Sequence, residues 1–146
     1  MPADQLKPKQ ASKSLVETVW YIGFVGKDKP DHWWDRFLKK GYHHVYFYTE
    51  LKADVLVFNM TKGGLTMFTI PLNCGKNIHI YLKELYGAGL ILPANGFVNT
   101  EMVLPRVSLC TCVELARSLL GIDKWLWTPY QLCKYIINHR LAGPPL

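Results

Sequence analysis

One cysteine in this chain stands where a catalytic nucleophile is commonly found. Cys112 begins a run in which Val113, Ala116 and Leu119 recur at helical spacing, and Gly121 follows as a stop. This pattern predicts a short amphipathic helix with the cysteine in its first turn. Unpaired backbone N–H groups and the positive end of the helix dipole stabilise a thiolate there, and the same N–H groups can bind an oxyanion. Cys112 is therefore the predicted nucleophile.

The base that such a nucleophile needs is predicted to be His44. Residues 43–50 and 55–61 are rich in β-branched and aromatic side chains, and the short polar segment between them predicts a β-hairpin. Folding the hairpin brings His44 roughly opposite Asn59 or the residue after it. Since residues paired across a hairpin share a face, Asn59 is the candidate to orient the imidazole ring.

Two adjacent histidines compete for the role of base. Side chains of a strand point alternately to opposite faces, so only one of His43 and His44 can face Cys112. Spacing alone does not decide which histidine faces the nucleophile.

Short motifs in this chain resemble the permuted branch of the papain-like superfamily. Residues 112–116 are similar to the start of the nucleophile helix in papain-like enzymes. Residues 44–48 resemble the strand that carries the base in NlpC-type peptidases and in relatives of lecithin:retinol acyltransferase, and this match favours His44. The histidine precedes the cysteine, as in the circularly permuted members, and residues 128–132 are similar to a motif of small phage-encoded members. The resemblance covers residues 33–135.

The resemblance implies an α+β fold in which an antiparallel sheet packs against the nucleophile helix. It implies a thiol peptidase or amidase, with peptidoglycan peptides as the first substrate class and Cys112, His44 and Asn59 as nucleophile, base and orienting residue. It also implies a phage virion or tail setting with other virion proteins as partners, and no cofactor or metal ion.

Two other functions stay open. The first is a virion structural protein that keeps the fold without the activity. Val113 stands where peptidases often carry a small residue, His44 has no evident aspartate partner, and the tryptophan-rich segments suit assembly contacts. The second is an acyltransferase that acts on lipid, and the shared fold is the one feature that supports it.

Length and composition predict a single globular domain. The chain has 146 residues, of which 49% are hydrophobic and 19% charged, which excludes a disordered class. No apolar run approaches the roughly 18 residues that span a bilayer, and the start shows no secretory signal pattern. We expect a virion-associated or host-cytoplasmic protein with a flexible basic arm over residues 1–14, one domain over 15–141 and a tail over 142–146.

A net charge of +6 favours anionic partners such as nucleic acid or cell-wall polymers, although it can equally serve solubility alone. No recognisable nucleic-acid module or phosphate-binding glycine loop occurs. A zinc site could be built from Cys110, Cys112, His43 and His44, but Cys-x-Cys beside adjacent histidines lacks the usual ligand spacing. The four cysteines include no Cys-x-x-Cys pair, so reduced thiols are expected.

Further elements are predicted from local patterns. Strands are predicted over residues 18–25 and 65–70, and an amphipathic helix with two tryptophans over 31–40. Residues 73–89 fit either a strand or a helix, and we prefer the helix. Residues 90–93 and 97–103 are predicted to form two short strands or a loop, because the turn-like sequence Ala-Asn-Gly separates the two segments.

The C-terminal part of the domain is predicted to hold a second helix. Thr128 and Pro129 are typical of a helix start, with threonine as the cap and proline at the first helical position. Before it, residues 122–127 form a connector in which Trp125 and Trp127 are expected to cover the core.

Overall fold

The structure, a computed structural model, describes residues 16–26, 36–61, 64–72, 77–98 and 111–139. Within these residues, five antiparallel strands form one sheet in the order β4-β3-β2-β1-β5. The strands are β1 (Val16–Val25), β2 (His44–Glu50), β3 (Asp54–Thr61), β4 (Gly64–Pro71) and β5 (Ala88–Val98). The helices are α1 (Ile78–Tyr86), α2 (Cys112–Leu120) and α3 (Pro129–Asn138). The predicted α+β class with an antiparallel sheet is confirmed.

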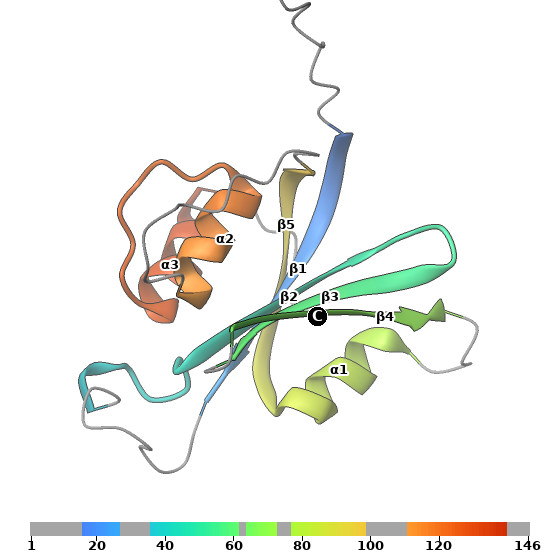
Figure 1. The fold of residues 1–146 in the computed structure, drawn as a ribbon. Helices are drawn as coiled ribbons and strands as arrows, with labels where there is room; N and C mark the ends of the chain where they lie inside the picture. Colours follow the sequence, from blue (N-terminus) through green and yellow to red (C-terminus); the bar gives the residue numbers. More distant parts are fainter. Residues whose placement is uncertain (1–15, 27–35, 62–63, 73–76, 99–110, 140–146) are drawn as a thin grey trace, which may run out of the picture.

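Helices cover both faces of the sheet, with α2 and α3 on one face and α1 on the other (Figure 1). Alternation along β2 divides its side chains between two hydrophobic cores. Val45 and Phe47 pack in the core under α2 and α3, whereas Tyr46 and Tyr48 pack in the core under α1. All four side chains are fully buried. Strand β2 is therefore an interior strand with no solvent-exposed face over these residues.

The core under α2 and α3 is aliphatic and aromatic. Trp20, Ile22 and Phe24 of β1 enter it from the sheet, and Phe58 meets the Trp20 ring edge-on at 5.6 Å between centroids. The helices contribute apolar side chains at helical spacing, namely Val113, Leu115, Ala116, Leu119 and Leu120 from α2 and Leu132, Cys133 and Ile136 from α3. The amphipathic pattern predicted for both helices is confirmed.

Local capping residues fix where the helices begin. Thr111 caps α2 and exchanges hydrogen bonds with Glu114, and Thr128 caps α3 and exchanges them with Gln131. Each pair forms a capping box, which satisfies two backbone N–H groups that the helix leaves unpaired. Pro129 occupies the first helical turn of α3, as predicted.

Three predictions about the elements are wrong. Strand β5 runs without a break through Asn95, because β1 pairs with β5 at this residue and on both sides of it. Pro93 is tolerated because β5 is an edge strand, where one side of the backbone needs no partner.

The second error concerns the predicted helix over residues 31–40. Residues 36–40 hold only a short 3₁₀ turn instead of a helix, and Phe37 is 78% exposed. The rest of that predicted helix lies outside the described residues, as do the predicted arm and tail.

The third error concerns the tryptophans of the connector. Trp125 and Trp127 are 68% and 74% exposed, and Ile122 and Leu126 are buried in their place. The helix preferred over residues 73–89 is confirmed as α1, whose N-cap is Asn77.

A close approach between β1 and β2 generates a test of the packing. A Cβ at Gly23 would overlap the ring of Tyr46, which is fully buried. Gly23→Ala is expected to lower the free energy of unfolding by about 1–3 kcal/mol, because the added methyl group overpacks this core. Urea unfolding measures the change.

The matched control is Gly89→Ala, whose Cβ meets no described atom within 4 Å. It should change stability by less than about 0.5 kcal/mol. The cost of Gly23→Ala should shrink when Tyr46→Val removes the ring. Equal effects of the two alanine replacements would contradict this packing.

Candidate functional site

The predicted partnership between a histidine and an asparagine on the hairpin is present. The Nε2 atom of His44 lies 2.6 Å from Oδ1 of Asn59, and both residues are half-buried. The amide oxygen accepts, so Nε2 carries the proton in this contact and Nδ1 of the neutral ring is the basic nitrogen. The register differs from the expected one, because Asn59 pairs with Tyr46 and reaches His44 diagonally.

The predicted nucleophile lies at the start of its helix, as the spacing indicates. Cys112 is the first residue of α2, directly after the Thr111 cap, and its side chain is half-buried. It packs at the edge of the core under α2 and α3. Its position gives it the positive end of the helix dipole and the first backbone N–H groups of the helix.

The sheet separates these two parts of the predicted triad. His44 shares its strand face with Tyr46 and Tyr48, and Asn59 shares its face with Val57, all of which pack toward α1. Helix α2, which carries Cys112, packs on the opposite face (Figure 1). The structure thus brings His44 to Asn59, and α2 approaches the sheet from the other side.

The position of His44 in its strand bears on this separation. His44 is the first residue of β2, so its side chain lies at the end of the sheet, where no further residue of the strand shields one face from the other. His43 immediately precedes the strand and donates its backbone N–H to the Val25 carbonyl at 2.9 Å. Strand alternation therefore assigns a face to His44, the one histidine of the pair that belongs to β2.

The other described cysteine is not a candidate nucleophile. Cys133 of α3 is buried, with 2% of its surface exposed, and burial raises the pKa of its thiol. Both features disfavour a reactive thiolate. Cys74 and Cys110, the second of which belongs to the zinc alternative, lie outside the described residues. Within the described ranges, no three His, Cys, Asp or Glu side chains gather closely enough to hold a metal ion.

Sequence reasoning missed a polar chain on the α1 face. Oη of Tyr48 lies 2.7 Å from Nδ1 of His79, and Nε2 of His79 lies 3.4 Å from a carboxylate oxygen of Glu50. Burial raises the pKa of Tyr48, so the phenol keeps its proton and donates it to Nδ1. The imidazole proton is then on Nε2, facing Glu50. Only the packing of α1 on β2 reveals this chain, because Tyr48 and His79 are distant in sequence.

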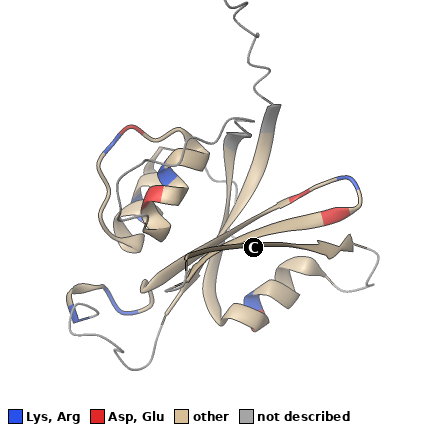
Figure 2. Ribbon diagram, viewed as in Figure 1, with Lys and Arg blue, Asp and Glu red and all other residues tan. Residues whose placement is uncertain are grey.

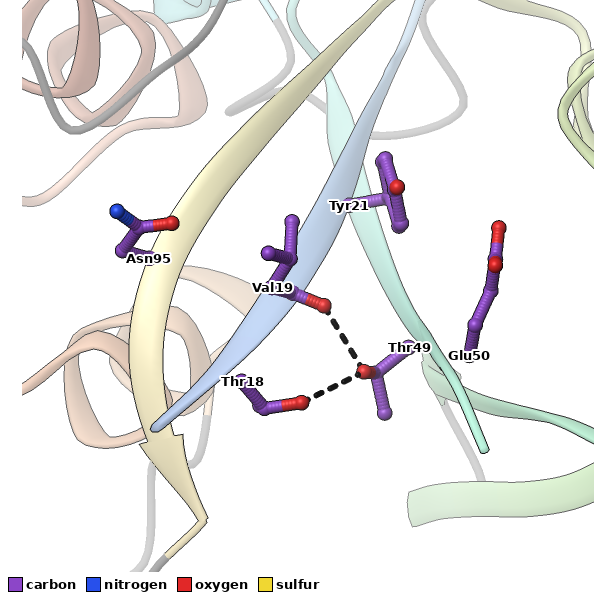
Figure 3. A pocket seen from close by; sticks show the side chains of 6 residues that line it. All are labelled: Thr18, Val19, Tyr21, Thr49, Glu50 and Asn95. Carbon is purple, nitrogen blue, oxygen red and sulfur yellow. Dashed lines mark hydrogen bonds between the residues drawn. The ribbon is translucent and has the colours of Figure 1, made fainter. Parts of the chain in front are cut away.

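A pocket of about 460 Å³ opens beside Glu50, at the opposite end of β2 from His44 (Figure 3). The Thr49 hydroxyl donates to the Val19 carbonyl at 2.9 Å and lies 3.3 Å from the Thr18 hydroxyl. These hydroxyls are already paired within the protein. The described residues that line the pocket include the Glu50 carboxylate but no cysteine or histidine, so the pocket holds neither part of the predicted thiol–imidazole pair.

Comparisons with models of protein families, with curated proteins and with solved structures find no match for this chain. Across the described residues, the helices are too short or too polar to cross a lipid bilayer.

The environment of His79 predicts how stability depends on pH. Burial lowers the pKa of His79 below its ordinary value of 6.5, and the nearby Glu50 carboxylate opposes this shift more weakly. The unfolded chain therefore binds a proton at His79 more readily than the folded chain, so stability is lost as the pH falls through the ordinary histidine range. We expect the free energy of unfolding to drop between about pH 7.5 and about pH 5.5.

The drop should be smaller in His79→Gln, which removes the titrating group. His139→Gln, which removes an exposed imidazole at the C-cap of α3, is the matched control and should keep the full drop. Urea unfolding at the two pH values measures both variants. A His79→Gln profile parallel to that of the original protein would contradict the assignment.

Proposed function

We propose that this protein is a papain-like thiol hydrolase of the permuted type, a peptidase or amidase with Cys112 as its nucleophile. The observation that carries the proposal is the 2.6 Å contact between His44 and Asn59. An imidazole held by an amide oxygen is the arrangement by which a base is kept in one tautomer and one orientation. Cys112 adds a thiol at a helix N-terminus.

The proposed reaction uses these groups in order. The imidazole of His44 takes the thiol proton, and the sulfur of Cys112 attacks a substrate carbonyl carbon to form a tetrahedral intermediate. Backbone N–H groups at the start of α2 bind the oxyanion. The imidazolium protonates the leaving amine, and water then hydrolyses the acyl-enzyme with the same imidazole as base. This reaction requires the His44 imidazole to reach the Cys112 thiol around the end of β2, where the strand begins.

Resemblance to NlpC-type enzymes supports peptide bonds of the bacterial cell wall as the substrate class and a phage virion or tail as the setting. The net charge of +6 is compatible with an anionic wall polymer.

A second candidate function is a virion structural protein on the same fold. The observation that favours it is the placement of α2 and the His44–Asn59 pair on opposite faces of the sheet. In this account the thiol and the imidazole do not meet, and the hydrogen bond of His44 only satisfies two half-buried polar groups.

Hydrolysis of purified peptidoglycan tests the two functions. The full chain should release new amino groups, and Cys112→Ala should reduce the rate by at least about 100-fold, since the acyl-enzyme cannot form. Asn59→Ala should reduce it by about tenfold or more through the loss of imidazole orientation. Thr66→Ala, an exposed change on the neighbouring strand β4, is the control and should leave the rate unchanged.

Failure of the folded protein to release amino groups from any wall fraction would favour the structural function. Release at equal rates by the original protein and Cys112→Ala would reject the cysteine as nucleophile.

A further inference from the structure

Two exposed tryptophans lie next to one another on the connector between α2 and α3. The rings of Trp125 and Trp127 stack with 5.7 Å between centroids and 21° between planes, and they are 68% and 74% exposed. The guanidinium carbon of Arg117 lies 5.0 Å from the Trp125 ring centroid. Exposed indoles grouped in this way are typical of surfaces that bind a partner.

A groove of about 280 Å³ lies beside Trp125, between the connector and α3. Its walls combine aromatic and basic side chains. The His139 ring stacks on Tyr135 with 3.9 Å between centroids, and Nζ of Lys124 lies 6.0 Å from the Tyr135 centroid. Lys134 also lines the groove, whereas no aspartate or glutamate does.

The charge around the groove is predominantly positive. Asp123, next to Lys124 on the connector, is the one acidic residue in positions 115–139 (Figure 2). Arg117 donates to the backbone carbonyl of Asp123 at 3.2 Å.

The basic surface extends past the groove to the start of α3. Nζ of Lys39 lies 3.8 Å from the Tyr130 ring centroid, and Nζ of Lys134 lies 5.6 Å from it. Cations and aromatic rings therefore alternate from the loop before β2 to the end of α3.

We propose that this surface, made of Trp125, Trp127, Lys124, Lys134 and Tyr135, binds single-stranded nucleic acid. Unpaired bases offer flat rings that stack on an exposed indole, and the phosphates between them pair with the lysines. A neutral glycan would use the indole faces and leave the cations without partners, and a duplex hides its base faces. The combination of rings and cations therefore fits a single strand best. This binding does not depend on the thiol chemistry proposed above.

Fluorescence anisotropy with a labelled oligothymidylate tests the proposal on the full chain. We expect saturable binding that weakens as salt increases. Trp127→Ala should weaken binding about tenfold, because a stacking partner for a base is lost. Lys134→Ala should weaken binding and reduce the slope of log affinity against log salt by about 1.

Matched controls come from the far side of the fold. Met67→Ala removes an exposed apolar side chain of β4, and Lys52→Ala removes an exposed positive charge at the β2–β3 turn. Both should bind nearly as the original protein does. The variants replace exposed side chains, so near-ultraviolet circular dichroism and urea unfolding should show intact folding.

Absence of saturable binding at low salt would overturn the proposal, as would equal losses in Trp127→Ala and Met67→Ala. Saturable binding of a soluble cell-wall glycan that Trp127→Ala abolishes, without binding of the oligothymidylate, would also overturn it and assign the surface to carbohydrate.

Discussion

Burial of β2 on both faces is the constraint on which the rest of the structure depends. Every side chain from Val45 to Thr49 is buried, so a polar group within this run costs free energy unless it finds a hydrogen-bonding partner inside the protein. The ends of β2 are His44 and Glu50, and each enters a polar contact, His44 with Asn59 and Glu50 with His79. Within the buried run, Thr49 donates its hydroxyl to a β1 carbonyl and the Tyr48 hydroxyl contacts His79. The hydrophobic sandwich thus leaves the imidazole and the carboxylate of β2, those of His44 and Glu50, at the ends of the strand.

The same constraint explains the arrangement of the candidate catalytic groups. Both faces of β2 are buried, so the direction of each side chain along the strand is fixed. Turning His44 to the other face would also move Tyr46 and Tyr48 out of the core under α1. Helix α2 must bury its apolar side against the opposite face, and it carries Cys112 with it. Catalysis by the proposed pair therefore requires the imidazole and the thiol to meet at the end of β2. An inactive structural protein has no such requirement.

Much of the fold could be predicted because its signals are local. The starts of α2 and α3 follow from Thr111 and Thr128 as caps, and the β2–β3 hairpin follows from two β-rich runs around a short turn. The contact between His44 and Asn59 could be predicted from the sequence, because the predicted hairpin brings the two residues together.

Features that depend on distant partners could not be predicted. Asn95 has the sequence character of a turn, yet pairing with Val19 of β1 holds it in a strand. Trp125 and Trp127 are exposed because Ile122 and Leu126 are the connector side chains that enter the core. Residue type alone does not show which of these four side chains is buried. The contact between Tyr48 and His79 joins residues 31 positions apart and needs the packing of α1 on the sheet.

The rate of cysteine alkylation tests most directly whether thiol and imidazole act together. After brief treatment with iodoacetamide near neutral pH, mass-spectrometric mapping should find the label on Cys112 well before Cys133, which is buried. His44→Ala should slow labelling of Cys112 by about tenfold or more, because a neighbouring imidazole favours the thiolate. His43→Ala is the matched control and should leave the rate unchanged. Slow labelling of both cysteines with no effect of His44→Ala, or a loss of rate in His43→Ala alone, would contradict the proposed pair.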